Sequence, residues 1–178
     1  MPGTLQDFAR AVHDVISTCR DAEQGFRGAA QAVNEPATKE IFQQYSAQRA
    51  QFAVELQGAV KALGFEPTDP QGLGGMMHAS WISLKSMVTG HNVRGILVEA
   101  ERAEDWSLKT YRVALGTTLR PEIRSIIQKQ FEEVQAAMIA LRACANPLSR
   151  RLIKLRNSRE RPLPSYRTPT LPAGDSPW

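Results

Sequence analysis

Apolar residues recur at alternating spacings of three and four in four separate stretches of this chain, and no other feature constrains its fold as much. This spacing places the apolar side chains on one face of an α-helix. The first stretch shows the pattern most clearly, at Leu5, Phe8, Val12, Val15, Cys19, Ala22, Phe26, Ala29 and Val33. Such a narrow stripe packs against its neighbours at shallow crossing angles, so the pattern predicts helices bundled side by side.

Proline and glycine mark the ends of these stretches. The first stretch ends at Asn34-Glu-Pro36, because the residue before a proline disfavours helical backbone angles. Gly64 is predicted to end the second stretch, and Pro121 to begin the fourth. The four stretches predict an all-α, antiparallel four-helix bundle within residues 1–147, with helices at about 5–33, 36–63, 93–115 and 121–146.

A shorter segment separates the second and third long stretches. Residues 64–75 form a connector rich in Gly, Pro and Asp. An extra short helix is predicted to follow it, with an apolar face made by Met77, Trp81, Leu84 and Val88. We expect this helix to cap one end of the bundle or to lie across one side.

Residues 148–178 form a basic, Pro-rich tail that is predicted to be largely disordered. The net charge of +4 is concentrated there, so a basic surface is not expected on the folded part. The tail has three interpretations: a solvated extension, attachment to anionic lipid or nucleic acid, and a docking peptide for a protein partner. The residues that would bind an anionic surface are Arg150, Arg151, Lys154 and Arg156.

Two acidic residues interrupt the apolar stripe of the third long stretch. The stripe consists of Leu97, Glu101, Glu104, Leu108, Tyr111 and Leu115. Its spacing carries Glu101 and Glu104 toward the core, where a carboxylate is costly unless it is paired, protonated or bound to a metal. Arg49 interrupts the stripe of the second stretch and is a candidate partner for them.

Four motifs occur in an order that resembles a known family. They are Asp21-Ala-Glu-Gln-Gly-Phe26, Gln48-Arg-Ala-Gln-Phe52 followed by Glu55-Leu56, Trp81-Ile-Ser-Leu-Lys-Ser86, and Glu99-Ala-Glu-Arg-Ala-Glu-Asp105. The set resembles a bacterial family of four-helix-bundle proteins of unknown function, placed in the ferritin-like superfamily. The resemblance implies a ferritin-like bundle of bacterial origin but no particular activity. Family members commonly carry a His followed by an acid near the end of the fourth helix, and the counterpart of that His here is Met138.

A ferritin-like di-iron site uses one Glu on each of two helices and Glu-x-x-His on each of the other two. No His of this chain lies three residues after a Glu, so the full signature is absent. A reduced carboxylate cluster could still hold a divalent metal such as Fe, Mn or Mg, through Glu23, Glu55, Glu101 and Glu104. The alternatives are a buried network of Arg49, Glu101 and Glu104 that needs no metal, and an acid/base site.

These features predict a non-catalytic interaction or stress-related protein, expected to form a homodimer. The alternatives are a metal-binding or redox protein with a degenerate carboxylate site, and a membrane- or nucleic-acid-associated module that works through its tail. The N-terminus lacks the layout of a signal peptide, and no apolar run is long enough to span a bilayer, so we expect a cytoplasmic location. Cys19 and Cys144 are predicted to be reduced thiols on apolar helix faces.

Overall fold

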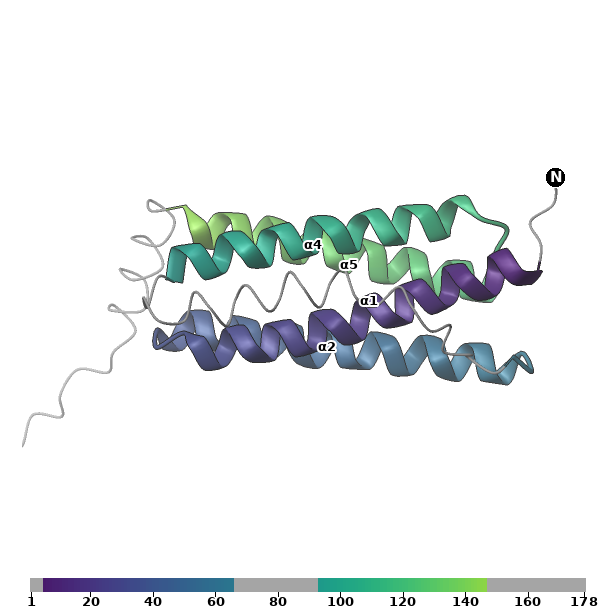
Figure 1. The fold of residues 1–178 in the computed structure, drawn as a ribbon, viewed down its shortest axis with the longest axis horizontal. Helices are drawn as coiled ribbons and strands as arrows, with labels where there is room; N and C mark the ends of the chain where they lie inside the picture. Colours follow the sequence, from purple (N-terminus) through teal and green to yellow (C-terminus); the bar gives the residue numbers. More distant parts are fainter. Residues whose placement is uncertain (1–4, 66–92, 147–178) are drawn as a thin grey trace, which may run out of the picture.

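The computed structural model describes residues 5–65 and 93–146, which form four long helices lying lengthwise against one another (Figure 1). They are α1 (Leu5–Ala32), α2 (Pro36–Ala62), α4 (Val93–Gly116) and α5 (Pro121–Ala145). These two described ranges contain no strand, so the predicted all-α four-helix bundle is confirmed. The predicted short helix after the connector, and the tail with its four basic residues, lie outside the described residues. None of the described helices is long and apolar enough to cross a membrane.

The helix ends follow the proline and glycine signals. Pro36 and Pro121 are the first residues of α2 and α5, and the residue before each is extended. This is the position where a missing N–H costs nothing and the fixed φ of proline suits a helix. Gly64, with φ of 80°, ends α2 as predicted. Its N–H donates to Lys61 O, and the N–H of Phe65 donates to Val60 O, which satisfies two of the last carbonyls of the helix.

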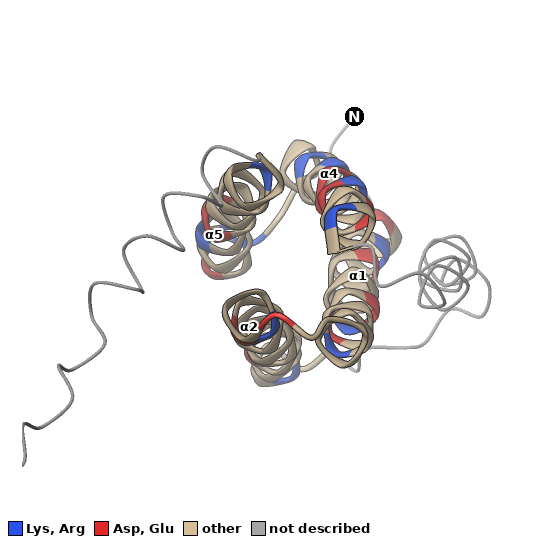
Figure 2. Cartoon of the chain, turned by 90° about the vertical axis from the view of Figure 1, so that its left-hand side faces the viewer, with Lys and Arg blue, Asp and Glu red and all other residues tan. Residues whose placement is uncertain are grey.

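Every pair of neighbouring helices in the bundle runs antiparallel. Seen end-on, the helices occupy four corners, with α1 between α2 and α4, and with α2 and α4 on one diagonal (Figure 2). The chain runs in the same direction through α2 and α4 (Figure 1). Phe65 and Val93 therefore lie at opposite ends of the bundle, and residues 66–92 connect those two ends.

Two apolar clusters fill the bundle, one toward each end. The first includes Phe8, Val15, Leu56, Leu108 and Ile127, and the second includes Phe26, Phe42, Leu97 and Leu141. The polar residues Arg49 and Glu104 are as deeply buried as these apolar side chains. Along its helix, each lies between residues of the first cluster and residues of the second. A polar layer thus divides the core near the middle of the bundle.

Candidate functional site

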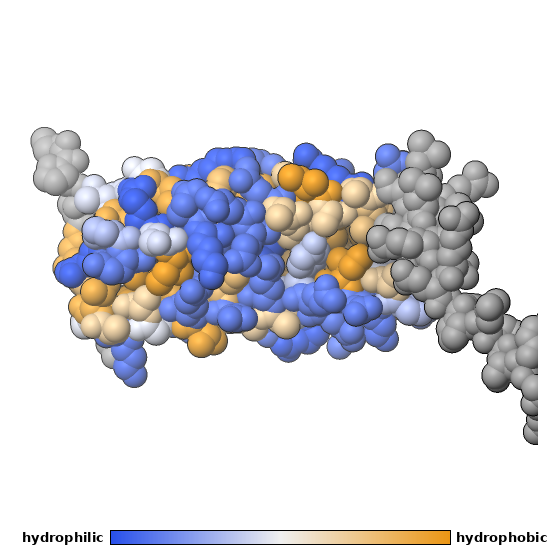
Figure 3. Space-filling model, turned by 180° about the vertical axis from the view of Figure 1, so that it is seen from behind, coloured by the Kyte–Doolittle hydropathy of each residue, from blue (hydrophilic) through white to orange (hydrophobic). Residues whose placement is uncertain are grey.

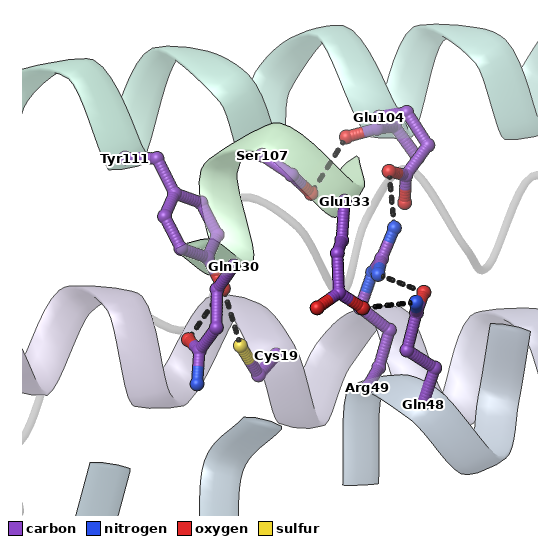
Figure 4. A network of polar contacts seen from close by, with 9 residues as sticks. Cys19, Gln48, Arg49, Glu104, Ser107, Tyr111, Gln130 and Glu133 are labelled. Atoms are coloured by element: carbon purple, nitrogen blue, oxygen red, sulfur yellow. Dashed lines mark hydrogen bonds and ion pairs between the residues drawn. The ribbon is translucent and has the colours of Figure 1, made fainter. Parts of the chain in front are cut away.

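Arg49 and Glu104 form a buried ion pair at the centre of this polar layer (Figure 4). Arg49 Nη2 donates to Glu104 Oε2 at 2.7 Å, and the two side chains are only 1% and 0% exposed. Arg49 comes from α2 and Glu104 from α4, the two helices on the diagonal. The contact therefore crosses the core and fixes the rotation of both helices.

The guanidinium group of Arg49 has further partners on α1 and α2, and one of these partners contacts α5. Its carbon lies 5.9 Å from the ring centroid of Phe26 and 5.3 Å from that of Phe52, close enough for cation–π attraction. Arg49 Nη1 donates to Gln48 Oε1 at 2.6 Å, and Gln48 Nε2 donates to Glu133 Oε2 at 2.8 Å. The charge of Arg49 is thus connected through Gln48 to a second, half-buried carboxylate on α5.

Burial sets the protonation tendencies of the central pair. Loss of hydration raises the pKa of Glu104, and the nearby positive charge of Arg49 opposes that rise. Burial acts to lower the pKa of Arg49, but the attraction of Glu104 outweighs it and leaves that pKa raised, so Arg49 remains charged. Arg49 Nε and Glu104 Oε1 have no hydrogen-bond partner among the described residues. A single close contact joins the two groups. Removal of either partner therefore leaves the other charge buried without compensation.

A second polar chain connects all four helices beside the first. Gln130 of α5 accepts a hydrogen bond from the hydroxyl of Tyr111 of α4 at 3.0 Å, and that hydroxyl lies 3.1 Å from the thiol sulfur of Cys19 of α1. Gln130 Nε2 donates to the α2 acceptors Phe52 O at 3.2 Å and Glu55 Oε2 at 2.9 Å. Because Tyr111 donates to Gln130, the thiol of Cys19 is the donor to Tyr111.

Burial also keeps the thiol of Cys19 and the phenol of Tyr111 protonated. It raises the pKa of Cys19 to about 11. It raises the pKa of Tyr111 well above its usual value, and the neighbouring Cys19 adds to the rise. Only the thiolate is a strong nucleophile or metal ligand, so Cys19 is unreactive at neutral pH. Cys19 and Cys144 are both free thiols.

The other predicted site residues have separate partners at the surface. Arg142 Nε donates to Glu101 Oε1 at 2.6 Å, and the side chain of Glu101 is 29% exposed. The prediction of a buried network that includes Glu101 therefore needs correction: Glu101 lies at the edge of the α4 stripe and pairs with α5. Glu23 pairs with Arg27 one turn along α1, and the exposed Glu55 accepts the hydrogen bond from Gln130.

The four predicted ligand residues are thus divided among four different partners. Within residues 5–65 and 93–146, no group of three or more His, Cys, Asp or Glu side chains is placed to hold a metal ion. Met138, the counterpart of the expected His, packs against the first apolar cluster. The geometry of the described residues suits a cross-linked polar layer better than a metal centre.

Sequence reasoning missed Gln130 and the Gln48–Glu133 contact. A signal for Gln130 was present, because it lies three residues after Ile127 and four before Val134, both on the apolar stripe of the fourth helix. A polar residue at such a position needs a buried partner. Nothing in the sequence indicated that Gln48 would bond to Glu133, because that contact depends on how α2 and α5 are aligned.

The structure defines a class of protein: a four-helix bundle whose core contains a cross-linked polar layer. The chain belongs to the family described as Domain of unknown function (DUF2383), whose model matches residues 7–117, more than half of the chain. This agrees with the expected membership of a family of unknown function. A comparison with curated proteins finds no match to the chain.

Proposed function

We propose that this protein is a non-catalytic bundle of the ferritin-like class, with an interaction or stress-related role, in which an arginine takes the place of a metal. The observation that carries the proposal is the contact between Arg49 Nη2 and Glu104 Oε2 at 2.7 Å in the centre of the bundle. Glu104 is fully buried, as a ferritin-like metal ligand would be, and its charge is balanced by the guanidinium group.

The helix connectivity supports membership of the ferritin-like class. In ferritin-like bundles one long crossover joins two helices that run in the same direction. Here α2 and α4 run in the same direction on a diagonal, and residues 66–92 join opposite ends of the bundle. The four motifs of the sequence support the same class and a bacterial origin.

The neighbouring carboxylates support the replacement of a metal by side-chain partners. A di-iron site needs carboxylates from four helices directed at one point. In this chain Glu101 is bonded to Arg142, Glu23 to Arg27 and Glu55 to Gln130. Each partner neutralises or hydrogen-bonds one carboxylate on its own, so no shared ion is needed to hold them.

The experiment is reconstitution of the full-length protein with Fe(II), Mn(II) or Zn(II), each tested separately. After removal of excess ion we expect much less than one metal per chain by elemental analysis. We also expect no rise in the midpoint of thermal unfolding, because a ligand that binds only the native state would raise it. Glu104→Gln and Glu101→Gln serve as a matched pair of buried and half-exposed carboxylates.

One result would overturn the proposal. It is stoichiometric metal in the native protein and in Glu101→Gln that is lost in Glu104→Gln, together with a metal-dependent rise in the unfolding midpoint. That pattern would show Glu104 to be a ligand and Arg49 to be its competitor or second-sphere partner.

A further inference from the structure

Two atoms of the central ion pair are buried without a hydrogen bond. Arg49 Nε and Glu104 Oε1 have no hydrogen-bond partner among the described residues, although both side chains lie deep in the core. The other two guanidinium nitrogens have acceptors, since Nη2 donates to Glu104 and Nη1 donates to Gln48. Buried polar groups are almost always hydrogen-bonded, so a donor and an acceptor left over at one ion pair indicate a bound molecule.

The way in which Arg49 is held disfavours a second direct contact between the two groups. A side-on pair would use two guanidinium nitrogens and both carboxylate oxygens. Arg49 instead makes the single bond from Nη2 to Glu104 Oε2. Turning the guanidinium plane toward Oε1 would pull Nη1 away from Gln48 and would move the group relative to the rings of Phe26 and Phe52. A third group between Arg49 Nε and Glu104 Oε1 satisfies both atoms without this loss.

The chemistry of the two atoms selects the kind of ligand. Arg49 Nε–H can only donate a hydrogen bond and Glu104 Oε1 of the carboxylate can only accept one, so the ligand must both accept and donate. The ion pair has no net charge, and in the core Glu104 repels an anion while Arg49 repels a cation. The two side chains are fully buried, so the ligand must also be very small. Water meets all of these requirements.

Ser107 offers a third partner for such a water molecule. It lies three residues after Glu104 on α4, so the two side chains share a face of that helix, and both project toward the core (Figure 4). The Ser107 hydroxyl donates to Ala103 O at 3.1 Å, which leaves its lone pairs to accept a hydrogen bond. Ala100 and Ala103 are buried beside Glu104 and carry only methyl groups, so they take up little space. Buried water molecules typically make about three hydrogen bonds.

We propose that the polar layer binds one internal water molecule, which accepts a hydrogen bond from Arg49 Nε and donates to Glu104 Oε1 and Ser107 Oγ. This water gives the ion pair a second connection across the core. It makes the centre of the bundle a site for a neutral hydrogen-bonding molecule, and it does so whether or not the protein has the proposed interaction or stress-related role.

Water can reach this site from the side of α2 and α5. Gln48 connects Arg49 to Glu133, which is half-buried between these two helices. Seen from behind, the face formed by α2 and α5 is largely hydrophilic near its middle (Figure 3). Opening of the contact between Gln48 and Glu133 therefore lets a water molecule enter through polar surroundings, without crossing either apolar cluster.

Nuclear Overhauser effects between water and the full-length, ¹⁵N-labelled protein test the site. We expect the Nε–H proton of Arg49 to show a dipolar contact with a long-lived water molecule, which the rotating-frame experiment distinguishes by sign from proton exchange. Arg142 is the reference, because its Nε bonds directly to Glu101 Oε1 at the surface, and it should show exchange alone. Lack of a dipolar contact at Arg49 would overturn the proposal. A saturable shift of the Arg49 signal with added sodium chloride would also overturn it, because an ion would then occupy the site.

A second measurement counts long-lived water molecules by ¹⁷O relaxation dispersion. Ser107→Val removes the third partner and fills its surroundings, so we expect the count to fall by one relative to the native protein. Thr110→Val is the matched control, because the hydroxyls of Ser107 and Thr110 both donate to a carbonyl one turn back on α4, at Ala103 and Trp106. Its count should equal the native one. The same count in all three proteins, or an equal fall in both variants, would contradict the proposed site.

Discussion

Arg49 combines a charge, two aromatic contacts and two hydrogen bonds at one buried position. Its partner Glu104 is fully buried, so the charge of each side chain is compensated in the core by the charge of the other. Breaking a buried pair by removing one partner typically costs about 3–5 kcal/mol, because an uncompensated charge remains. A surface pair such as Glu101–Arg142 is worth about 0–1 kcal/mol.

We predict that Arg49→Met lowers the free energy of unfolding at pH 7 by about 3–5 kcal/mol. Methionine keeps an apolar side chain beside Phe26 and Phe52 but leaves Glu104 without a counter-charge. Without Arg49, burial alone raises the pKa of Glu104 further, so the carboxyl group takes up a proton as the pH falls. The defect should therefore be larger at pH 8 than at pH 5, as measured by urea unfolding.

Two further variants separate the charge effect from a packing defect. Arg49→Met combined with Glu104→Gln removes both charges and should recover much of the lost stability and most of the pH dependence. Arg142→Met, at the surface pair, should change the unfolding free energy by less than about 1 kcal/mol. If the double variant is as unstable as Arg49→Met alone, the cost comes from packing and not from an unpaired charge.

At the level of individual residues, the sequence predicted only part of the site. The stripe of the third stretch placed Glu101 and Glu104 together, but only Glu104 is buried. The buried residues of α4 include Ala100, Ala103 and Ser107, which move the centre of the buried face away from Glu101. Small residues carry little hydrophobic signal, so the sequence pattern gave the leucines and the tyrosine too much weight.

The helices themselves were largely predictable, because their ends depend on local chemistry. Pro36 and Pro121 begin helices, and Gly64 follows the end of α2. These residues act through their own backbone angles, which a single sequence contains. The alignment of one helix with another depends on distant side chains, which is why the contact between Gln48 and Glu133 was not predicted.

Two glycines of α2 should respond to the same substitution with opposite signs. Gly64 has φ of 80°, where a Cβ atom is strained, so Gly64→Ala should lower stability by about 1 kcal/mol. Gly58 lies inside the helix, and a Cβ built there has no atom within 4 Å. Gly58→Ala should therefore raise stability by about 0.5–1 kcal/mol. Thermal and urea unfolding of the two variants test this, and changes of the same sign would contradict it.

Across the whole molecule, the polar chain from Cys19 through Tyr111 to Gln130 connects α1, α4 and α5, and Gln130 extends it to α2. These residues lie within the first apolar cluster, beside the ion pair that separates the two clusters (Figure 4). Apolar packing alone tolerates sliding and rotation of helices, whereas buried hydrogen bonds must be satisfied in one arrangement. We infer that the layer sets the alignment of the bundle.

The protons on the Cys19 thiol and the Tyr111 hydroxyl make the stability of the whole bundle sensitive to alkaline pH. Folding raises the pKa of Cys19 from 9.0 to about 11, so between these values the folded protein holds a proton that the unfolded chain has lost. The stabilisation is complete below pH 9 and is lost as the pH rises through 11. Tyr111 acts in the same direction at still higher pH, because its pKa is also raised. Two pKa units at this fully buried thiol correspond to about 2–3 kcal/mol.

Cys19→Ser isolates this contribution, because serine keeps a hydroxyl group beside Tyr111 but does not ionise in this range. Between pH 9 and 11 we expect the unfolding free energy of the native protein to fall about 2–3 kcal/mol further than that of Cys19→Ser. The loss of lysine charges affects both proteins equally and cancels in the comparison. A native profile parallel to that of Cys19→Ser would mean that the fold does not hold this proton.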